Sequence, residues 1–165
     1  MATYETELLA RLCALELEAM ASIGVTKVDA KPYFIHTQDS FPYFTNRIAA
    51  NPVTSQGNAE DIDNNSPLVI IRMVVGHVTE GNRGQPEGKL YEWGPVVKTY
   101  LQRRSNWLQC AAAPYNTRME NLQQAIVTDA GGFRVFTDSG IGALQVGREI
   151  QLQCIFDEYI EQVYY

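Results

Sequence analysis

Leu68-Val-Ile-Ile-Arg-Met-Val-Val-Gly-His-Val78 is the stretch of this sequence that decides the fold. Its near-continuous apolar run, interrupted by Arg72 and His77, predicts a strand that is covered on both faces. A segment rich in turn-forming residues lies on each side of the run, at 50–67 and at 80–88. We expect these two segments to form long polar loops.

An amphipathic helix is predicted at the start of the chain, over residues 4–22. Apolar residues recur there at spacings of three and four, and Gly24 suits the position just beyond a helix C-terminus. The apolar stripe consists of Leu8, Leu12, Leu15, Ala19 and Ile23, widened by Leu9 and Met20. The polar residues Glu7, Arg11, Glu16 and Glu18 occupy the remaining positions. Because one side of this helix is apolar, it must pack on another part of the protein.

Shorter patterns predict the other elements. Between the first helix and the central strand, we expect strands at 25–29, 33–36 and 43–49. Pro32 and Pro42 interrupt this region, which favours edge or irregular strands. Gly94-Pro95 is typical of a helix start and predicts a second helix at 95–108. Further strands are expected at 122–128, 133–137 and 149–155, whereas residues 110–121 fit no single pattern.

The last strand alternates regularly between apolar and polar residues. Its apolar side consists of Ile150, Leu152, Cys154 and Phe156, with Gln151 and Gln153 on the other side. At Asp157-Glu158 the alternation changes parity, since Tyr159 continues the apolar series from an odd position. Such a change predicts a bulge, or a new strand with a different partner.

Together these elements predict one α+β domain over residues 1–165. A mainly antiparallel sheet carries both helices on one face, and the segments 50–67 and 80–92 project from it as polar loops. The length suits a single hydrophobic core. Unpaired sheet edges and projecting loops are features that assembly with other chains can satisfy.

Composition disfavours several classes of function. The chain has a net charge of −6 and a pI of about 4.9, which argues against a nucleic-acid grip because such a grip needs a cationic face. Arg103-Arg104 is the only adjacent basic pair. The N-terminus lacks the pattern of a signal peptide, and no window approaches the length of an apolar membrane span. Cys13, Cys110 and Cys154 lack a metal-ligand spacing, and we expect free thiols.

The sequence offers little for catalysis. His36 lies three residues before Asp39, next to Ser40, but triads are recognised by geometry and not by proximity in sequence. His77 lies in the apolar strand, where an imidazole of the core or of an interface is expected. The acidic run 60–63 lacks the glycine and the closing glutamate of a calcium loop, so we interpret it as a solvated loop. We therefore expect no catalytic residue, no cofactor and no metal site.

The order of these elements resembles the tail-terminator (tail-completion) proteins and related neck proteins of tailed bacteriophages. The resemblance covers nearly the whole chain: the opening helix, the Phe41-Pro42 step into a strand, the apolar strand 68–78, the mid-chain helix, and a last strand rich in Ile and Tyr. It implies a structural virion protein that is assembled in the host cytoplasm. Such a subunit would form a hexameric ring at the head–tail junction, cap the tail tube and dock it to the head connector.

The resemblance also implies partners and a functional surface. The tail tube protein and the head-side connector or adaptor would be the partners, and DNA would pass through the ring without specific binding. No lysine or arginine occurs from residue 149 to the end, so this segment is a candidate lining of the lumen or an interface. The candidate residues are Glu149, Asp157, Glu158, Glu161, Tyr159, Tyr164 and Tyr165. A solvated strand face is the alternative interpretation. The segments 50–67 and 80–92 are candidate contacts with neighbouring rings.

Other functions fit the same residues. A head-completion or connector-adaptor protein would occupy a different neck position with the same fold. A small-ligand-binding or enzymatic α+β domain would need a pocket between helices and sheet, for which Trp93, Trp107 and the tyrosines are candidates. A host-side adaptor that pairs strands with a partner is a third alternative.

Overall fold

The computed structural model of the chain describes residues 4–34, 41–50, 53–56, 62–78, 84–109, 119, 121–129, 134–137 and 144–159. For the strand residues 53–56, 62–65, 134–137 and 157–159 it describes the backbone alone. The helices are α1 (Tyr4–Ala21), α2 (Gly84–Leu101) and α3 (Arg104–Gln109). The strands are β1 (Asp29–Lys31), β2 (Tyr43–Ala50), β3 (Val53–Gln56), β4 (Ile62–Asn65), β5 (Leu68–Val78), β6 (Leu122–Asp129), β7 (Arg134–Thr137) and β8 (Leu144–Tyr159).

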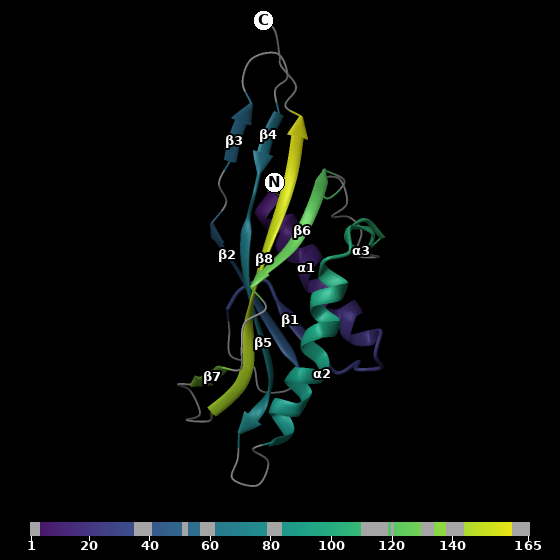
Figure 1. Ribbon diagram of the computed structural model, residues 1–165, viewed down its shortest axis with the longest axis vertical. Coiled ribbons are helices and arrows are strands. Elements are labelled where there is room, and N and C mark those ends of the chain that lie inside the picture. Colours follow the sequence, from purple (N-terminus) through teal and green to yellow (C-terminus); the bar gives the residue numbers. More distant parts are fainter. Residues whose placement is uncertain are drawn as a thin grey trace, which may run out of the picture.

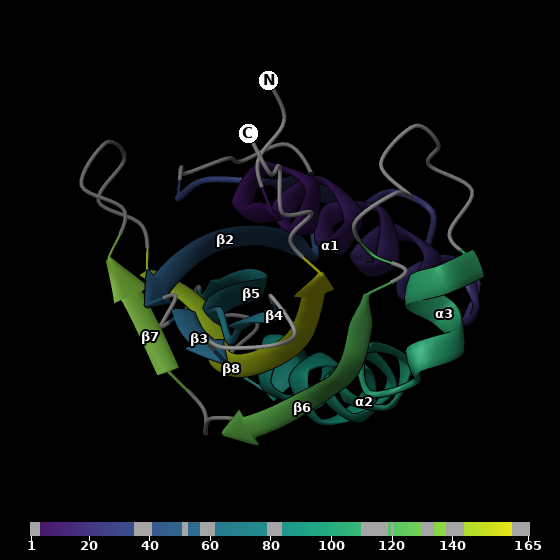
Figure 2. The same ribbon diagram turned by 90° about the horizontal axis from the view of Figure 1, so that it is seen from above.

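All eight strands belong to one sheet. Its order is β1-β2-β5-β8-β4-β3, and β6 and β7 pair with the other edge of β8. The pairing of β1 with β2 is parallel and every other pairing in this sheet is antiparallel. Helix α1 contacts β1 and β2, α2 contacts β5 and β8, and the two helices contact each other. In Figure 2, β7 lies on the side of the molecule opposite α3. The predicted α+β class and mainly antiparallel sheet are confirmed.

The longest feature of the sheet is a hairpin that runs alongside β8. One arm consists of β2 followed by β3. The other arm consists of β4 followed by β5, with Ser66 and Pro67 between these two strands. Strand β8 pairs with β5 as far as Gln153 and with β4 from Phe156 onward. At the junction the amide of Cys154 donates to the carbonyl oxygen of Pro67 over 3.0 Å. The hairpin and β8 therefore remain paired across the break.

The far end of this hairpin extends past the helices. Figure 1 shows β3, β4 and the end of β8 continuing beyond α1 and α2. We call β3, β4 and residues 156–159 of β8 the projecting end. The prediction of a loop over 50–67 is wrong, because this segment contains two strands. Their sequences, VTSQ and IDNN, are mainly polar, so no apolar alternation marks them.

The core lies between the helices and one face of the sheet. The central strand β5 contributes Val69, Ile71, Met73 and Val75, all of them buried. On the opposite face Leu68 and Ile70 are half-buried, whereas Val74 is fully buried. The prediction that both faces of this strand are covered therefore holds at Val74 and fails at Leu68 and Ile70.

Helix α1 matches its predicted span, and Gly24 follows it at a φ of 81°. The amide of Val25 donates to the carbonyl of Met20 and that of Gly24 to Ala21, both over 3.0 Å, which is the Schellman pattern. Ile23, however, is 41% exposed and does not belong to the buried stripe. The buried apolar residues are Leu8, Leu12, Leu15, Ala19 and Met20.

Several polar residues of α1 are also buried, namely Glu7, Arg11 and Glu16. The cause is that α1 contacts β1 and β2 on one side and α2 and α3 on another. The guanidinium of Arg11 donates from Nε and Nη2 to the carbonyl oxygen of Trp107, over 2.8 and 2.6 Å. Arg11 thus connects α1 to α3, a role that helical periodicity does not reveal.

The second helix begins earlier than predicted. Helix α2 starts at Gly84, so most of the segment 80–92 is helical and the predicted loop is wrong there. Pro86 lies in the first turn, where its missing amide is harmless, and Pro95 lies inside the helix with its ring exposed. Both prolines fit a helix start by sequence, and the prediction chose the second one. The chain then turns and continues as α3.

The predicted strands agree in part with the structure. Strand β1 shares only Asp29 with the predicted strand at 25–29, and residues 33–34 are not in a strand, while 35–36 lie outside the described residues. Strand β8 runs to Tyr159 in regular register with β4, so the predicted bulge or new strand at Asp157-Glu158 is wrong. Its partner changes, but the strand continues.

Gly147 allows the closest approach between β5 and β8. The register shifts between Val74 and Gly76, and a Cβ atom on Gly147 would collide with the carbonyl oxygen of Met73. We predict that Gly147→Ala lowers the free energy of unfolding by about 3 kcal/mol. The control Gly88→Ala, on the exposed side of α2 with open space around it, should raise this free energy by about 0.8 kcal/mol. Urea denaturation of both variants measures the difference, and equal stabilities would contradict the assignment.

The buried carboxyl of Glu16 gives a second prediction. It accepts a hydrogen bond from Asn46 Nδ2 over 3.0 Å, its other oxygen has no hydrogen-bond partner, and Cys13 and the Lys31 carbonyl lie beside the same amide. Burial raises the pKa of Glu16 well above its ordinary value of 4.5. In the folded protein the carboxyl therefore keeps its proton at pH values where the unfolded chain has lost it.

This difference makes the folded state less stable as pH rises above 4.5, until the raised pKa is passed. We expect Glu16→Gln to remove this part of the pH dependence and to be more stable than the unaltered chain at neutral pH. Urea denaturation between pH 4 and pH 8 measures it. Glu92→Gln, at an exposed position, serves as the control and should follow the unaltered chain. A Glu16→Gln profile parallel to that of the control would refute the prediction.

Candidate interaction surface

The sheet face away from the helices is the candidate surface, and we call it the open face. In register, Arg72 lies opposite Glu149, Ile70 opposite Gln151, and Leu68 opposite Gln153. Residues directly opposite each other in an antiparallel pair point to the same side of the sheet. All six are half-buried. This part of the open face thus consists of aliphatic and amide side chains with a single opposite-charge pair.

Glu149 forms that charge pair and is not a free carboxylate. Its Oε1 lies 3.2 Å from Nη2 of Arg72, and both side chains are less than one-third exposed. The ring of Phe34 lies under two guanidinium groups, 4.7 Å from that of Arg72 and 4.9 Å from that of Arg47. The positive partner of Glu149 comes from another strand, so the sequence from residue 149 to the end, which contains no lysine or arginine, does not reveal it.

The other candidate residues divide between the two faces. By strand parity Asp157 and Tyr159 share the face of Glu149, opposite Asn64 and Ile62 of β4. Glu158 occupies the opposite face, in register with Asp63. Glu161, Tyr164 and Tyr165 lie outside the described residues. The structure therefore brings three of the seven candidates onto one strand face and separates Glu158 from them.

The projecting end is acidic, since its described residues include Asp63, Asp157 and Glu158 and no lysine or arginine. The two longer stretches of sequence in which its strands lie, 53–65 and 156–165, also contain no lysine or arginine. They contain the acidic residues Glu60, Asp61, Asp63, Asp157, Glu158 and Glu161. The remainder of the chain contains thirteen acidic and thirteen basic residues and is neutral. The register even sets Asp63 directly opposite Glu158, an arrangement that is unfavourable in a sheet.

His77 borders a hollow of about 350 Å³ near the start of α2. Its ring meets the edge of Phe41, with centroids 4.9 Å apart, and its Nε2 lies 3.4 Å from Nε2 of Gln145. Tyr43 donates from its hydroxyl to Oε1 of Gln145 over 2.6 Å. The described side chains that line the hollow include Lys89 but no carboxylate, thiol or hydroxyl. His36, the other histidine, lies outside the described residues.

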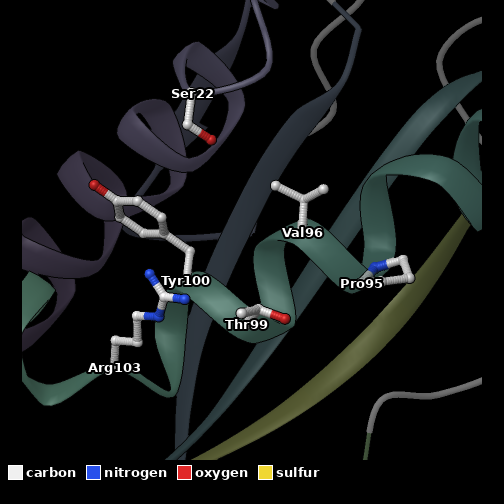
Figure 3. Close-up of a pocket in the computed structure, with 6 residues that line it drawn as sticks. All are labelled: Ser22, Pro95, Val96, Thr99, Tyr100 and Arg103. Carbon is white, nitrogen blue, oxygen red and sulfur yellow. The ribbon is translucent and has the colours of Figure 1, made fainter.

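A second hollow, of about 370 Å³, lies between the end of α1 and α2 (Figure 3). It is lined by Ser22, Pro95, Val96, Thr99, Tyr100 and Arg103. Ser22 donates from its hydroxyl to the carbonyl of Ala19 over 2.6 Å, and Tyr100 donates to Glu18 Oε2 over 2.9 Å. These hydrogen bonds stabilise helix ends and helix packing, and leave a mainly apolar groove.

Neither tryptophan lines the two hollows that the described residues form. Trp107 is fully buried and donates from Nε1 to the carbonyl oxygen of Leu101 over 2.7 Å, and Trp93 belongs to the core. Of the aromatic residues considered for a ligand pocket, Tyr100 lines the second hollow, whereas both indoles are buried in the core. Indoles with one polar atom commonly pack in a core in this way when a backbone carbonyl accepts their hydrogen.

Within the described ranges, no three side chains of His, Cys, Asp or Glu come together as metal ligands. None of the helices that the structure describes is long and apolar enough to cross a membrane. Neither the protein-family models nor the curated proteins that were compared match this chain.

The ion pair on the open face gives a third prediction. Because Arg72 and Glu149 are partly buried and joined by a charged hydrogen bond, Glu149→Gln should lower the free energy of unfolding by about 1 kcal/mol. Arg72→Gln and the double variant complete a double-mutant cycle, measured by urea denaturation at low and high salt. The cycle should give a stabilising coupling energy between Arg72 and Glu149, and high salt should reduce this energy only slightly. Additive effects of the two substitutions would contradict the pairing.

Proposed function

We propose that this chain is a structural virion protein of a tailed phage, a ring-forming tail terminator that caps the tail tube and docks it to the head connector. The observation that supports this proposal best is the projecting end. Three paired strands extend beyond the helix-covered body, and their described residues include Asp63, Asp157 and Glu158 but no basic residue. A projection of this kind suits contact between one ring and the next.

The order of the elements supports the same proposal. Helix α1 opens the chain, the hairpin from β2 to β5 follows, α2 crosses the sheet, and the long strand β8 closes it. This is the order on which the resemblance to tail-terminator proteins rests. The strand that enters after Phe41-Pro42 is β2, and the mid-chain helix is α2. The topology places both helices on one face and leaves the open face for contacts with other molecules.

The charge distribution suits a ring through which DNA passes without being held. The projecting end is acidic, and carboxylates repel phosphates. The adjacent arginines Arg103 and Arg104 lie at the turn between α2 and α3, where the Nε of Arg104 donates to the carbonyl oxygen of Leu122 over 2.6 Å. One member of the basic pair is thus occupied in holding α3 against β6. This arrangement favours a structural role over a nucleic-acid grip.

The proposal predicts a multimer. Native mass spectrometry and light scattering of the purified chain should give a species of six times 18.5 kDa, and electron microscopy should show rings. Addition of purified tail tubes should increase the proportion of rings bound at tube ends. A compact monomer at every concentration tested, together with absence of the protein from purified particles, would refute the proposal.

A further inference from the structure

The second hollow, between the end of α1 and α2, contains two polar side chains that come from one face of α2. The helical turn continues past the end of α2 to Arg103, whose amide donates to the carbonyl oxygen of Tyr100 over 3.4 Å. Thr99 and Arg103 are four positions apart and are therefore neighbours on the helix surface. Both line the hollow, together with Val96 from the preceding turn (Figure 3).

The donors of these two side chains are not used within the part of the chain that the structure describes. Neither the hydroxyl of Thr99 nor the guanidinium of Arg103 forms a hydrogen bond or an ion pair with a described residue. The other two polar side chains of the hollow are engaged, since the hydroxyls of Ser22 and Tyr100 donate to acceptors in α1. The hollow thus presents one positive charge and one further donor.

These donors fit a carboxylate. A guanidinium offers two parallel N–H groups that match the two carboxylate oxygens, and a hydroxyl can donate a third hydrogen bond. Among the described residues that line the hollow, Arg103 alone is charged, and the carboxyl of Glu18 already accepts a hydrogen bond from Tyr100. A single positive charge suits a carboxylate better than a phosphate group, which carries a charge of about −2 at pH 7.

The size and the walls of the hollow indicate the rest of the ligand. Pro95, Val96 and the ring of Tyr100 supply apolar surface. Six residues line the hollow, and its volume is about 370 Å³. Pockets for small ligands begin at about 300 Å³, whereas a protein partner buries about 800 Å² on each side of an interface. The hollow therefore suits a small molecule with an apolar body better than a protein segment.

We propose that the second hollow binds a small carboxylic acid with an apolar body. The carboxylate accepts hydrogen bonds from Arg103 and Thr99, and the body packs on Pro95 and Val96. This inference goes beyond the proposed function, because the site involves neither the open face nor the projecting end. It holds whether or not the chain forms the proposed ring.

Phenylacetate, added to the full chain, tests the inference. The amide NMR signals of Val96, Thr99 and Arg103 should shift and saturate with a Kd of about 1 mM, in the range of such small ligands. Phenylacetamide has the same shape without the charge, and acetate has the charge without the ring. Each should bind at least about tenfold more weakly than phenylacetate. Inorganic phosphate should cause no saturable shift at these amides.

Variants at exposed positions test the role of each donor. Arg103→Gln should weaken phenylacetate binding about tenfold and Thr99→Val about threefold, because a charged hydrogen bond contributes more than a neutral one. Lys89→Gln is the matched control. It removes a lysine that lines the other hollow, where its ammonium lies 5.5 Å from the centroid of the Trp93 ring, and it should leave the Kd unchanged. Unchanged amide signals of β8 establish that each variant keeps its fold.

Four results would overturn the inference. One is the absence of a saturable shift up to about 10 mM phenylacetate, ten times the expected Kd. Another is equal binding of phenylacetamide, and a third is an unchanged Kd in Arg103→Gln. The last is a shift at His77 and Lys89 in place of Thr99 and Arg103, which would move binding to the other hollow. Light scattering of the same samples tests the ring proposal separately, so failure of one proposal is distinguishable from failure of the other.

Discussion

Antiparallel pairing along the whole of β8 is the constraint on which the rest of this structure depends. This strand holds β5 and β4 on one edge and β6 and β7 on the other. Its register with β5 decides which side chains face the helices, and so it decides where the core lies. The glycine at position 147 permits the two backbones to approach where the register shifts. The register of β8 with β5 therefore also decides which side chains lie together on the open face.

The same alignment divides the molecule into two parts with different physical character. Where α1 and α2 cover the sheet, burial of aliphatic side chains stabilises the fold. Past the helices, β3, β4 and the end of β8 are joined by the main-chain hydrogen bonds of their antiparallel pairing. A segment stabilised in this way gains more from a partner than a packed core does. The proposed role in assembly follows from this division.

Sequence patterns predicted the parts of the fold that bury an apolar face. They located α1, β2, β5, β6 and the alternating part of β8 to within a few residues, apart from the early start of that strand. They missed β3 and β4, because these strands are defined by pairing and not by burial. They also missed the buried Arg11 and Glu16, since helical periodicity cannot reveal a helix packed on two sides. The acidic character of the candidate surface could be predicted from the sequence. The sequence alone does not show that Glu149 contacts Arg72 or that Glu158 is in register with Asp63, because each pair comes from strands that are distant in sequence.

The uneven placement of charge makes the protein an electric dipole, negative at one end of its long axis. Copies that stand side by side in the same direction bring their negative ends together, and this lateral repulsion opposes their association. Dissolved salt screens such repulsion over about 10 Å at 0.1 M ionic strength. For parallel packing of this chain, added salt therefore strengthens association, whereas complexes held by opposite charges weaken under the same treatment.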